Sequence, residues 1–148
     1  MNANTLARPT LFRRALLLDA ATGAVTALLL IAGASFLAPQ LGLPTALLSG
    51  AGLVLIPIVV LLAWLVRSPR ISKWLAWSVI EMNLLWVLAS FGLLLGGQVS
   101  PTLLGQIFVI VQALAVLAFA IVQFIAWRRE GAVLSAPAAD AAATIRTA

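Results

Sequence analysis

The stretch RSPRISKWLAWSVIEMNLLWVLASFGLLLGG, residues 67–97, decides the fold because it joins a short basic segment to a long apolar run. A helix needs about 20 apolar residues, at 1.5 Å per residue, to cross the hydrocarbon core of a membrane. The run from Trp74 to Leu95 supplies 22 residues. We therefore expect a transmembrane helix, and the two polar residues near its middle, Glu81 and Asn83, need an explanation.

Three other apolar runs have similar length and composition, at residues 15–37, 46–66 and 103–127. Together with residues 74–95 they make four segments that are each long enough to cross a bilayer as a helix. The whole chain has a mean hydropathy of +1.16, far above that of an ordinary soluble domain. We therefore expect an all-α membrane protein, a bundle of four transmembrane helices.

Proline and glycine mark the breaks between these runs, because proline lacks a backbone N–H and glycine is conformationally permissive. One break is predicted at residues 38–45 and another at 96–102. Pro57 lies in the middle of the second run and predicts a kinked helix. At the two ends of the chain, residues 1–14 are predicted to form a cytoplasmic segment and 128–148 a disordered cytoplasmic tail.

The basic start of the first run also fits a secretory signal, which combines positive charge, an apolar core and small residues such as those from Ala32 to Ser35. Signal cores are about 7–15 residues long. The apolar run at residues 15–37 contains 23 residues. We therefore interpret it as a membrane span.

The composition limits the chemistry available to the chain. Of its 148 residues, 64% are hydrophobic and 9% are charged, whereas about a quarter are charged in an ordinary soluble domain. The absence of Cys and His excludes disulfides, thiolate or imidazole metal sites and bis-histidine haem. The sequence has no visible nucleophile and base pair and no glycine-rich phosphate loop, so we predict neither an enzyme nor a bound cofactor or metal.

The basic residues indicate how the chain crosses the membrane, because segments rich in Lys and Arg stay in the cytoplasm. The predicted anchors of topology and interface are Arg13, Arg14, Arg67, Arg70, Lys73, Arg128 and Arg129, and Arg8 and Arg146 lie on the same predicted side. The breaks at 38–45 and 96–102 contain no basic residue. Both termini and the middle loop are therefore predicted to be cytoplasmic. The net charge of +5 reflects this topology rather than nucleic-acid binding.

Tryptophans support the same orientation, because indole rings favour the membrane interface. Four of them lie at the basic ends of the spans: Trp64, Trp74, Trp77 and Trp127. The interface at the basic side is therefore predicted to pass close to these residues.

Polar and small side chains line one face of each predicted helix. Lipid gives helices no hydrophobic drive to associate, so such faces mark helix contacts, and the simplest bundle points them inward. The candidate intramembrane polar residues are Asp19, Thr22, Thr26, Glu81, Asn83, Ser90, Gln112 and Gln123. Hydrogen bonding between helices is one role for them. A substrate pathway is the other, because buried polar groups in membranes also mark substrate routes.

Two carboxylates within the runs raise specific alternatives. Asp19 lies in the first turns of its span, where it either interacts with the helix dipole and interfacial arginines or serves a site on the cytoplasmic side. Glu81 lies about 160° from Asn83 on a helical wheel, on a face that otherwise resembles lipid contact. A charge near mid-span costs at least a few kcal/mol. Glu81 is therefore either a tolerated neutral carboxyl or the mark of an interface with a second copy or another membrane protein.

Several short motifs resemble those of a family of small four-span bacterial integral membrane proteins. They are LLLDAATG at residues 16–23, LGLPTALL at 41–48, N-x-x-W-x-x-x-S from Asn83 to Ser90, and PTLLGQ at 101–106 with QAL at 112–114. The resemblance covers roughly residues 11–127 and implies four spans in a bacterial inner membrane, but no reaction. Glu81 departs from the family pattern, which implies a small apolar residue there.

Two functions stay open at this point. The first is a non-catalytic accessory or structural membrane component, whose lipid-like face meets another membrane protein. The second is a small oligomeric transporter or channel that uses Asp19 or Glu81 as an ion-binding carboxylate. Small multidrug exporters share the number of spans, but their dual-topology forms need a weak charge bias. This chain has a strong one, because all its basic residues fall on one predicted side. The expected partners are the lipid bilayer and a second copy or another membrane protein.

Overall fold

The computed structural model describes residues 10–135, which form five α-helices and no strand. The helices are α1 (Leu11–Ala32), α2 (Ala34–Leu41), α3 (Thr45–Arg67), α4 (Lys73–Leu95) and α5 (Leu103–Ser135). Four of them, α1, α3, α4 and α5, are long and apolar enough to cross a membrane. The predicted all-α fold with four candidate membrane spans is therefore confirmed.

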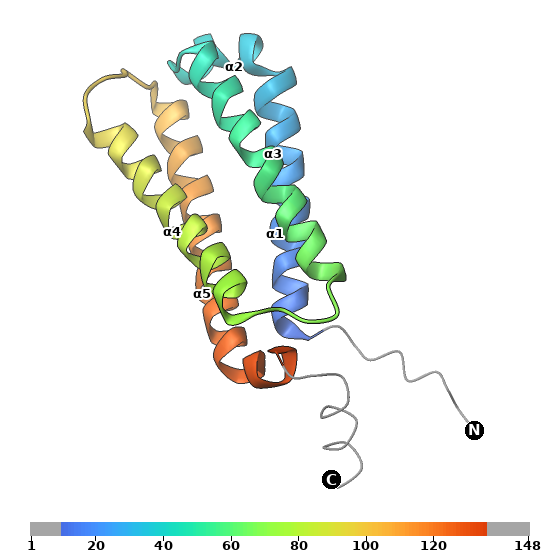
Figure 1. Ribbon diagram of the computed structural model, residues 1–148. Helices are drawn as coiled ribbons and strands as arrows, with labels where there is room; N and C mark the ends of the chain where they lie inside the picture. The colour runs from blue at the N-terminus through green and yellow to red at the C-terminus, as the bar shows by residue number, and fades with distance from the viewer. Residues whose placement is uncertain (1–9, 136–148) are drawn as a thin grey trace, which may run out of the picture.

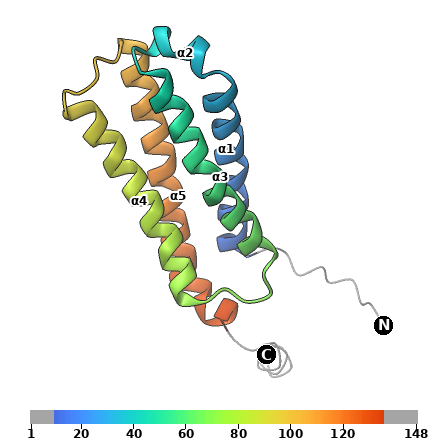
Figure 2. The ribbon, with the colours of Figure 1, turned by 45° about the horizontal axis from the view of Figure 1, so that its top comes forward.

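The four long helices form a bundle of two pairs, which can be followed in Figure 1 and Figure 2. α1 packs along α3, and α4 packs along α5. α1 also contacts α5 and so joins the two pairs, whereas α3 and α4 scarcely touch. In Figure 1 the start of α1, the end of α5 and the α3–α4 connection lie at one end of the bundle, here called the terminal end. α2 and the α4–α5 connection lie at the other, the loop end.

Local capping residues set where two of the helices begin. The Thr10 hydroxyl accepts a hydrogen bond from the Arg13 N–H at 3.4 Å, and the Ser72 hydroxyl accepts one from the Leu75 N–H at 3.3 Å. Such side chains satisfy N–H groups that the first turn of a helix leaves free. The basic segment before α4 therefore also supplies the N-cap of that helix.

The first span differs from its prediction at the loop end. After α1, the short helix α2 continues to Leu41, so the chain is helical through Pro39. The predicted break at 38–45 is therefore wrong in extent and shrinks to residues 42–44. A proline removes only one backbone donor, and bonds from elsewhere in the fold hold the end of α2.

The residue before α5 holds the end of α2 in place. Thr102 donates its N–H to the Leu41 carbonyl at 3.0 Å and its hydroxyl to the Gln40 carbonyl at 2.6 Å. These bonds satisfy carbonyls that a helix end leaves free. Gly42 then turns the chain with a φ of +65°, which favours glycine. A side chain at Gly105 would collide with the Leu41 carbonyl, so glycine allows α5 to approach α2 closely.

The fourth span extends beyond its predicted end. The apolar run stops at Trp127, but α5 continues to Ser135. The prediction of a disordered tail is therefore wrong for residues 128–135, and the remainder of that tail lies outside the described residues. The first helix likewise begins at Leu11, inside the segment 1–14 that is predicted to precede the membrane.

Charged side chains explain these extensions, because they cap helices at the terminal end. The Glu130 carboxylate accepts the N–H groups of Leu11 and Phe12, each at 2.9 Å, and so caps α1 from α5. Arg13 donates to the carbonyls of Val66 and Ser68, both at 2.6 Å, and caps the end of α3. Both caps join segments that are distant in the sequence, which no local pattern reveals.

Two hydrophobic clusters fill the bundle. The cluster of the terminal end contains Phe12, Leu16, Leu62, Leu65, Ile71, Ala76, Val79, Ala126 and Trp127 among its buried members. The cluster of the loop end contains Ala27, Leu30, Ala34, Leu41, Leu43, Leu48, Leu55 and Val109. Polar side chains lie along the interior between these two groups.

A close approach of α1 and α3 stabilises the first helix pair. A Cβ atom at Gly52 would come within 2.7 Å of Ile31 Cγ1 and 3.0 Å of the Ala27 carbonyl oxygen. Small residues permit such packing between membrane helices. α3 is one continuous helix with Pro57 inside it, and the kink expected at this proline stays a prediction.

Candidate functional site

Three of the eight candidate polar residues meet inside the bundle. Asp19 of α1, Asn83 of α4 and Gln123 of α5 are only 7%, 6% and 0% exposed. The Asn83 amide donates to Asp19 Oδ2 at 2.9 Å and to Gln123 Oε1 at 3.1 Å. The Gln123 amide donates to the same Asp19 Oδ2 at 2.7 Å. We call these three residues the polar triad.

Helical periodicity turns the triad inward from three helices. Asn83 lies four residues after the buried Val79 and four before the buried Val87, so it belongs to the inward face of α4. Gln123 stands three residues from each of two buried alanines, Ala120 and Ala126. These small neighbours leave room for the longer glutamine side chain. The inward orientation expected for the polar faces therefore holds at these positions.

The triad gives both amide nitrogens acceptors but gives the carboxylate no cation. Among the described residues no Lys or Arg side chain bonds to Asp19, since Arg13 caps α3 and Arg128 lies 5.8 Å from the Phe124 ring centre. Asp19 thus bonds to its triad partners rather than to an interfacial arginine. A buried charge without a counter-charge is costly. The two amide donors offset part of that cost, and they connect three helices while doing so.

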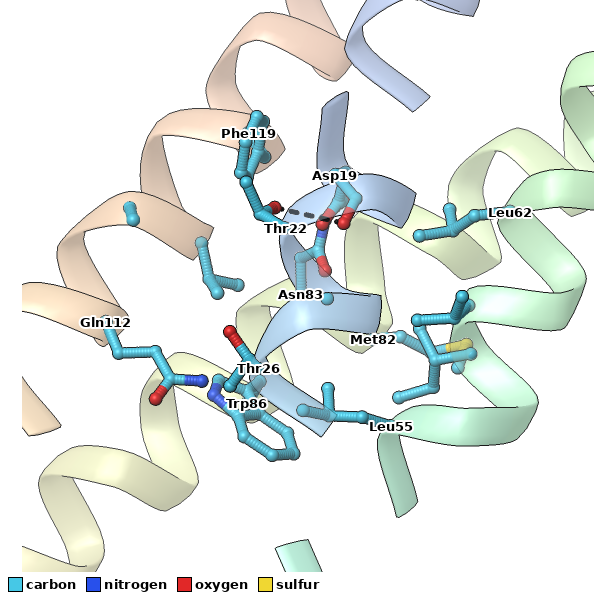
Figure 3. A pocket seen from close by; sticks show the side chains of 15 residues that line it. Asp19, Thr22, Thr26, Leu55, Leu62, Met82, Asn83, Trp86, Gln112 and Phe119 are labelled. Atoms are coloured by element: carbon cyan, nitrogen blue, oxygen red, sulfur yellow. Dashed lines mark hydrogen bonds between the residues drawn. The ribbon is translucent and has the colours of Figure 1, made fainter. Parts of the chain in front are cut away.

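A cavity of about 160 Å³ adjoins the triad. Figure 3 shows Asp19 and Asn83 together in its lining, with Thr26, Trp86 and Gln112 gathered farther along it. The other lining residues are Thr22, Gly23, Leu55, Ile58, Val59, Leu62, Met82, Ala115, Val116 and Phe119. The cavity is therefore mainly apolar, with polar side chains concentrated in two places.

Several polar atoms of this lining have no hydrogen-bond partner in residues 10–135. Asp19 Oδ1 accepts no bond, and the side chains of Thr26, Trp86 and Gln112 make none. Every fully enclosed side-chain nitrogen or oxygen in the described part of the chain does have a partner. The unbonded atoms therefore keep some accessible surface, and the residues that carry them line the cavity. The cavity offers an occupant one carboxylate oxygen and several neutral polar groups.

A second cavity, of about 220 Å³, lies beside the first and nearer the loop end. The two share Trp86 and Gln112. The rest of the second lining is apolar apart from Ser90, whose hydroxyl donates to the Trp86 carbonyl at 2.8 Å. Side chains of both α3 and α4 line each cavity, and these are the two helices that scarcely touch. The two cavities thus lie next to each other, the first with the triad residues Asp19 and Asn83 in its lining and the second mainly apolar.

Two further candidate residues do not join the triad. Thr22 lines the first cavity, but its hydroxyl donates within α1, to the carbonyls of Leu18 at 2.9 Å and Asp19 at 3.1 Å. Glu81 is exposed on α4, next to the exposed side chains of Leu85 and Leu88, and makes no hydrogen bond to a described residue. The sequence-based separation of Glu81 from Asn83 onto different faces therefore corresponds to the structure.

The predicted anchors lie at the terminal end, with one addition and one difference. Arg14, Arg67, Arg70, Lys73, Arg128 and Arg129 are exposed there, whereas Arg13 is partly buried in its cap. The sequence-based interpretation missed Glu130, although a carboxylate suits the positive end of a helix. Trp127 is buried rather than exposed at an interface, and its ring centre lies 5.3 Å from that of Phe12. A tryptophan at the basic end of a span can lie either in the core or at the interface, and the sequence does not distinguish the two.

Comparisons with known proteins assign no family to the chain, so the class of protein is defined here by the fold and the site. In residues 10–135, His, Cys, Asp and Glu side chains nowhere gather in threes that could hold a metal ion. No protein-family model, curated protein or solved structure matches the chain. The resemblance to small four-span bacterial membrane proteins therefore stays an expectation. The fold and site define a multi-pass α-helical protein with four candidate membrane spans and a buried polar triad beside two cavities.

Proposed function

We propose that the chain is a non-catalytic accessory component of a bacterial inner membrane that contacts another membrane protein through the outward face of α4. Glu81 is the observation that carries this proposal. Its side chain stands near the middle of the helix, is exposed and has no partner in the described residues. A carboxyl group that faces lipid at this depth costs several kcal/mol. A hydrogen-bonding or cationic group on a partner protein offsets that cost.

The surroundings of Glu81 support the same proposal. The exposed neighbours on its face are large and apolar, with Trp74 82%, Leu85 63% and Leu88 67% exposed. Of the three carboxylates that the structure describes, Asp19 is buried in the triad and Glu130 caps α1. Glu81 is thus the one described carboxylate that the fold itself does not use. An apolar face with a single polar group is suited to a specific contact within the bilayer.

Crosslinking in native membranes tests the proposal. A photoreactive amino acid at Leu85, one turn from Glu81, is expected to capture one other membrane polypeptide, and Glu81→Leu is expected to abolish the product. The same label at Val60, on the exposed side of α3, is the matched control and should capture lipid only. Lipid adducts alone at both positions would contradict the proposal. Capture of a second copy of this chain would replace the accessory role with self-association.

A small transporter or channel is the second candidate, and the position of Asp19 favours it. This carboxylate lines a cavity inside the bundle rather than only packing helices together. If it binds a translocated cation, Asp19→Asn should abolish proton- or sodium-driven flux in proteoliposomes, whereas Glu81→Gln should leave the flux intact. Equal flux with and without the protein would remove this candidate.

A further inference from the structure

The polar end of the first cavity has the chemistry of a cation site. Asp19 is nine-tenths buried, and two amide donors occupy its Oδ2 while its Oδ1 remains for an occupant. No Lys or Arg side chain lines either cavity. A donor that carries positive charge therefore complements Asp19 best, because charge-assisted hydrogen bonds are about twice as strong as neutral ones.

The lining becomes apolar with distance from the triad. Trp86 stands at the junction of the two cavities, and its ring can cover an alkyl chain or attract a nearby cation. Beyond it, the second cavity is lined mainly by Leu30, Leu43, Leu47, Leu48, Leu93 and Phe108. An occupant that bonds to Asp19 and follows this path therefore has an apolar body.

We propose that the two cavities form one binding site for a lipophilic ammonium ion. The ammonium nitrogen donates to Asp19 Oδ1, and the apolar chain passes Trp86 into the second cavity. The proposal concerns the interior of the bundle, so it does not depend on the partner proposed at Glu81. It names an occupant for the cavity beside the triad, and it holds whether or not the protein moves that occupant across a membrane.

The arrangement of the helices gives such a ligand a route from the bilayer. α3 and α4 both line the cavities, and their backbones approach each other less closely than those of the other neighbouring long helices, so the cavities lie behind the most loosely packed side of the bundle. A ligand that arrives from lipid has already left water, and burying its apolar chain in protein then gains little. The contact with Asp19 should therefore dominate selectivity.

Calorimetry with matched amphiphiles is the test. n-Decylammonium is titrated at pH 7 into the full chain in phosphatidylcholine nanodiscs, with empty discs as the reference for partitioning. We expect saturable binding of one ion per chain. The neutral analogue 1-decanol, with the same chain length, should bind at least tenfold more weakly. Equal affinity for the two compounds, or no saturable binding above the empty discs, would overturn the proposal.

Two carboxylate variants separate a specific site from general attraction to negative charge. Asp19→Asn should weaken decylammonium binding at least tenfold. Glu81→Gln removes a carboxylate from the same part of the membrane without touching the cavities and should change affinity less than twofold. Similar losses in both variants, or none in Asp19→Asn, would show that the cavity is not a cation site.

A third variant keeps the test valid if Asp19→Asn fails to fold. Ala89 lines the second cavity and not the first, which has Asp19 and Asn83 in its lining. Ala89→Phe should therefore leave the triad intact while it fills the apolar end of the path. We expect decylammonium to bind at least fivefold more weakly to this variant and n-butylammonium to bind unchanged. An unaltered affinity for decylammonium would contradict the proposed position of its chain.

Discussion

At the scale of single residues, two glutamines on α5 are expected to differ in how much they stabilise the fold. Gln123 makes two hydrogen bonds within the triad, whereas the Gln112 side chain makes none in the described part of the chain. Gln123→Leu should therefore lower the free energy of unfolding by about 1–2 kcal/mol, because it removes a donor to a buried carboxylate. Gln112→Leu should change it by less than about 0.5 kcal/mol.

Unfolding of the purified protein in mixed micelles by increasing mole fractions of dodecyl sulfate provides the measurement. Both substitutions replace an amide with an apolar group on the same helix, so changes in insertion or detergent binding are shared between them. A loss of equal size in both variants would mean that the triad contributes no more to stability than an ordinary cavity-lining side chain.

The residue scale also shows how far the sequence predicts the site. Inward orientation of Asp19, Asn83 and Gln123 follows from helical periodicity, which is a property of each helix alone. Helical periodicity does not show which polar residues meet, because that depends on how the helices are rotated and shifted against one another. Ser90 and Gln112 lie on equally polar faces but reach cavities instead of the triad. No spacing within a single span distinguishes these two outcomes.

At the scale of elements, hydropathy predicts where a helix can cross lipid but not where it ends. The apolar run of the fourth span stops at Trp127, yet α5 continues to Ser135, because Glu130 caps α1 and the Ile71 N–H donates to the Leu134 carbonyl at 3.1 Å. The extension of the first span into α2 has a similar cause at the loop end. Each boundary that the sequence misplaces is set by a contact from a distant segment.

The cap on α1 leads to a prediction for that helix as an element. Glu130→Ala removes both acceptors for the N–H groups of Leu11 and Phe12. We expect these two amides to exchange hydrogen at least tenfold faster, and the free energy of unfolding to fall by about 1 kcal/mol, as for loss of an N-cap. Exchange in the middle of α1 should change little, because fraying stays within the first turn.

Hydrogen–deuterium exchange followed by peptide mass spectrometry resolves the two regions of α1. Glu81→Ala removes a described carboxylate that makes no such cap, and it should leave exchange at Leu11 and Phe12 unaltered. Faster exchange along the whole of α1 in Glu130→Ala would indicate global destabilisation and would argue against a local capping role.

At the scale of the whole molecule, the two helix pairs are held together unevenly. The terminal end has two charged caps and a hydrophobic cluster that includes Phe12 and Trp127, and the loop end is joined by the bonds of Thr102. Between these ends, α1 and α5 form the main contact between the pairs, while α3 and α4 leave a seam. The cavities lie behind that seam. The two helix pairs are therefore held together at both ends, while the cavities can be reached from the side between α3 and α4.

The charge distribution over the whole molecule predicts its orientation. Seven basic residues of the described chain lie at the terminal end, and the connections at the loop end have none. Retention of basic segments in the cytoplasm therefore predicts that both termini lie there. Alkaline phosphatase fused after residue 148 should be inactive in a bacterial host and active when inserted in the 96–102 connection; green fluorescent protein should report the reverse. An active C-terminal phosphatase would invert the orientation, and Asp19 would then lie nearer the outer surface.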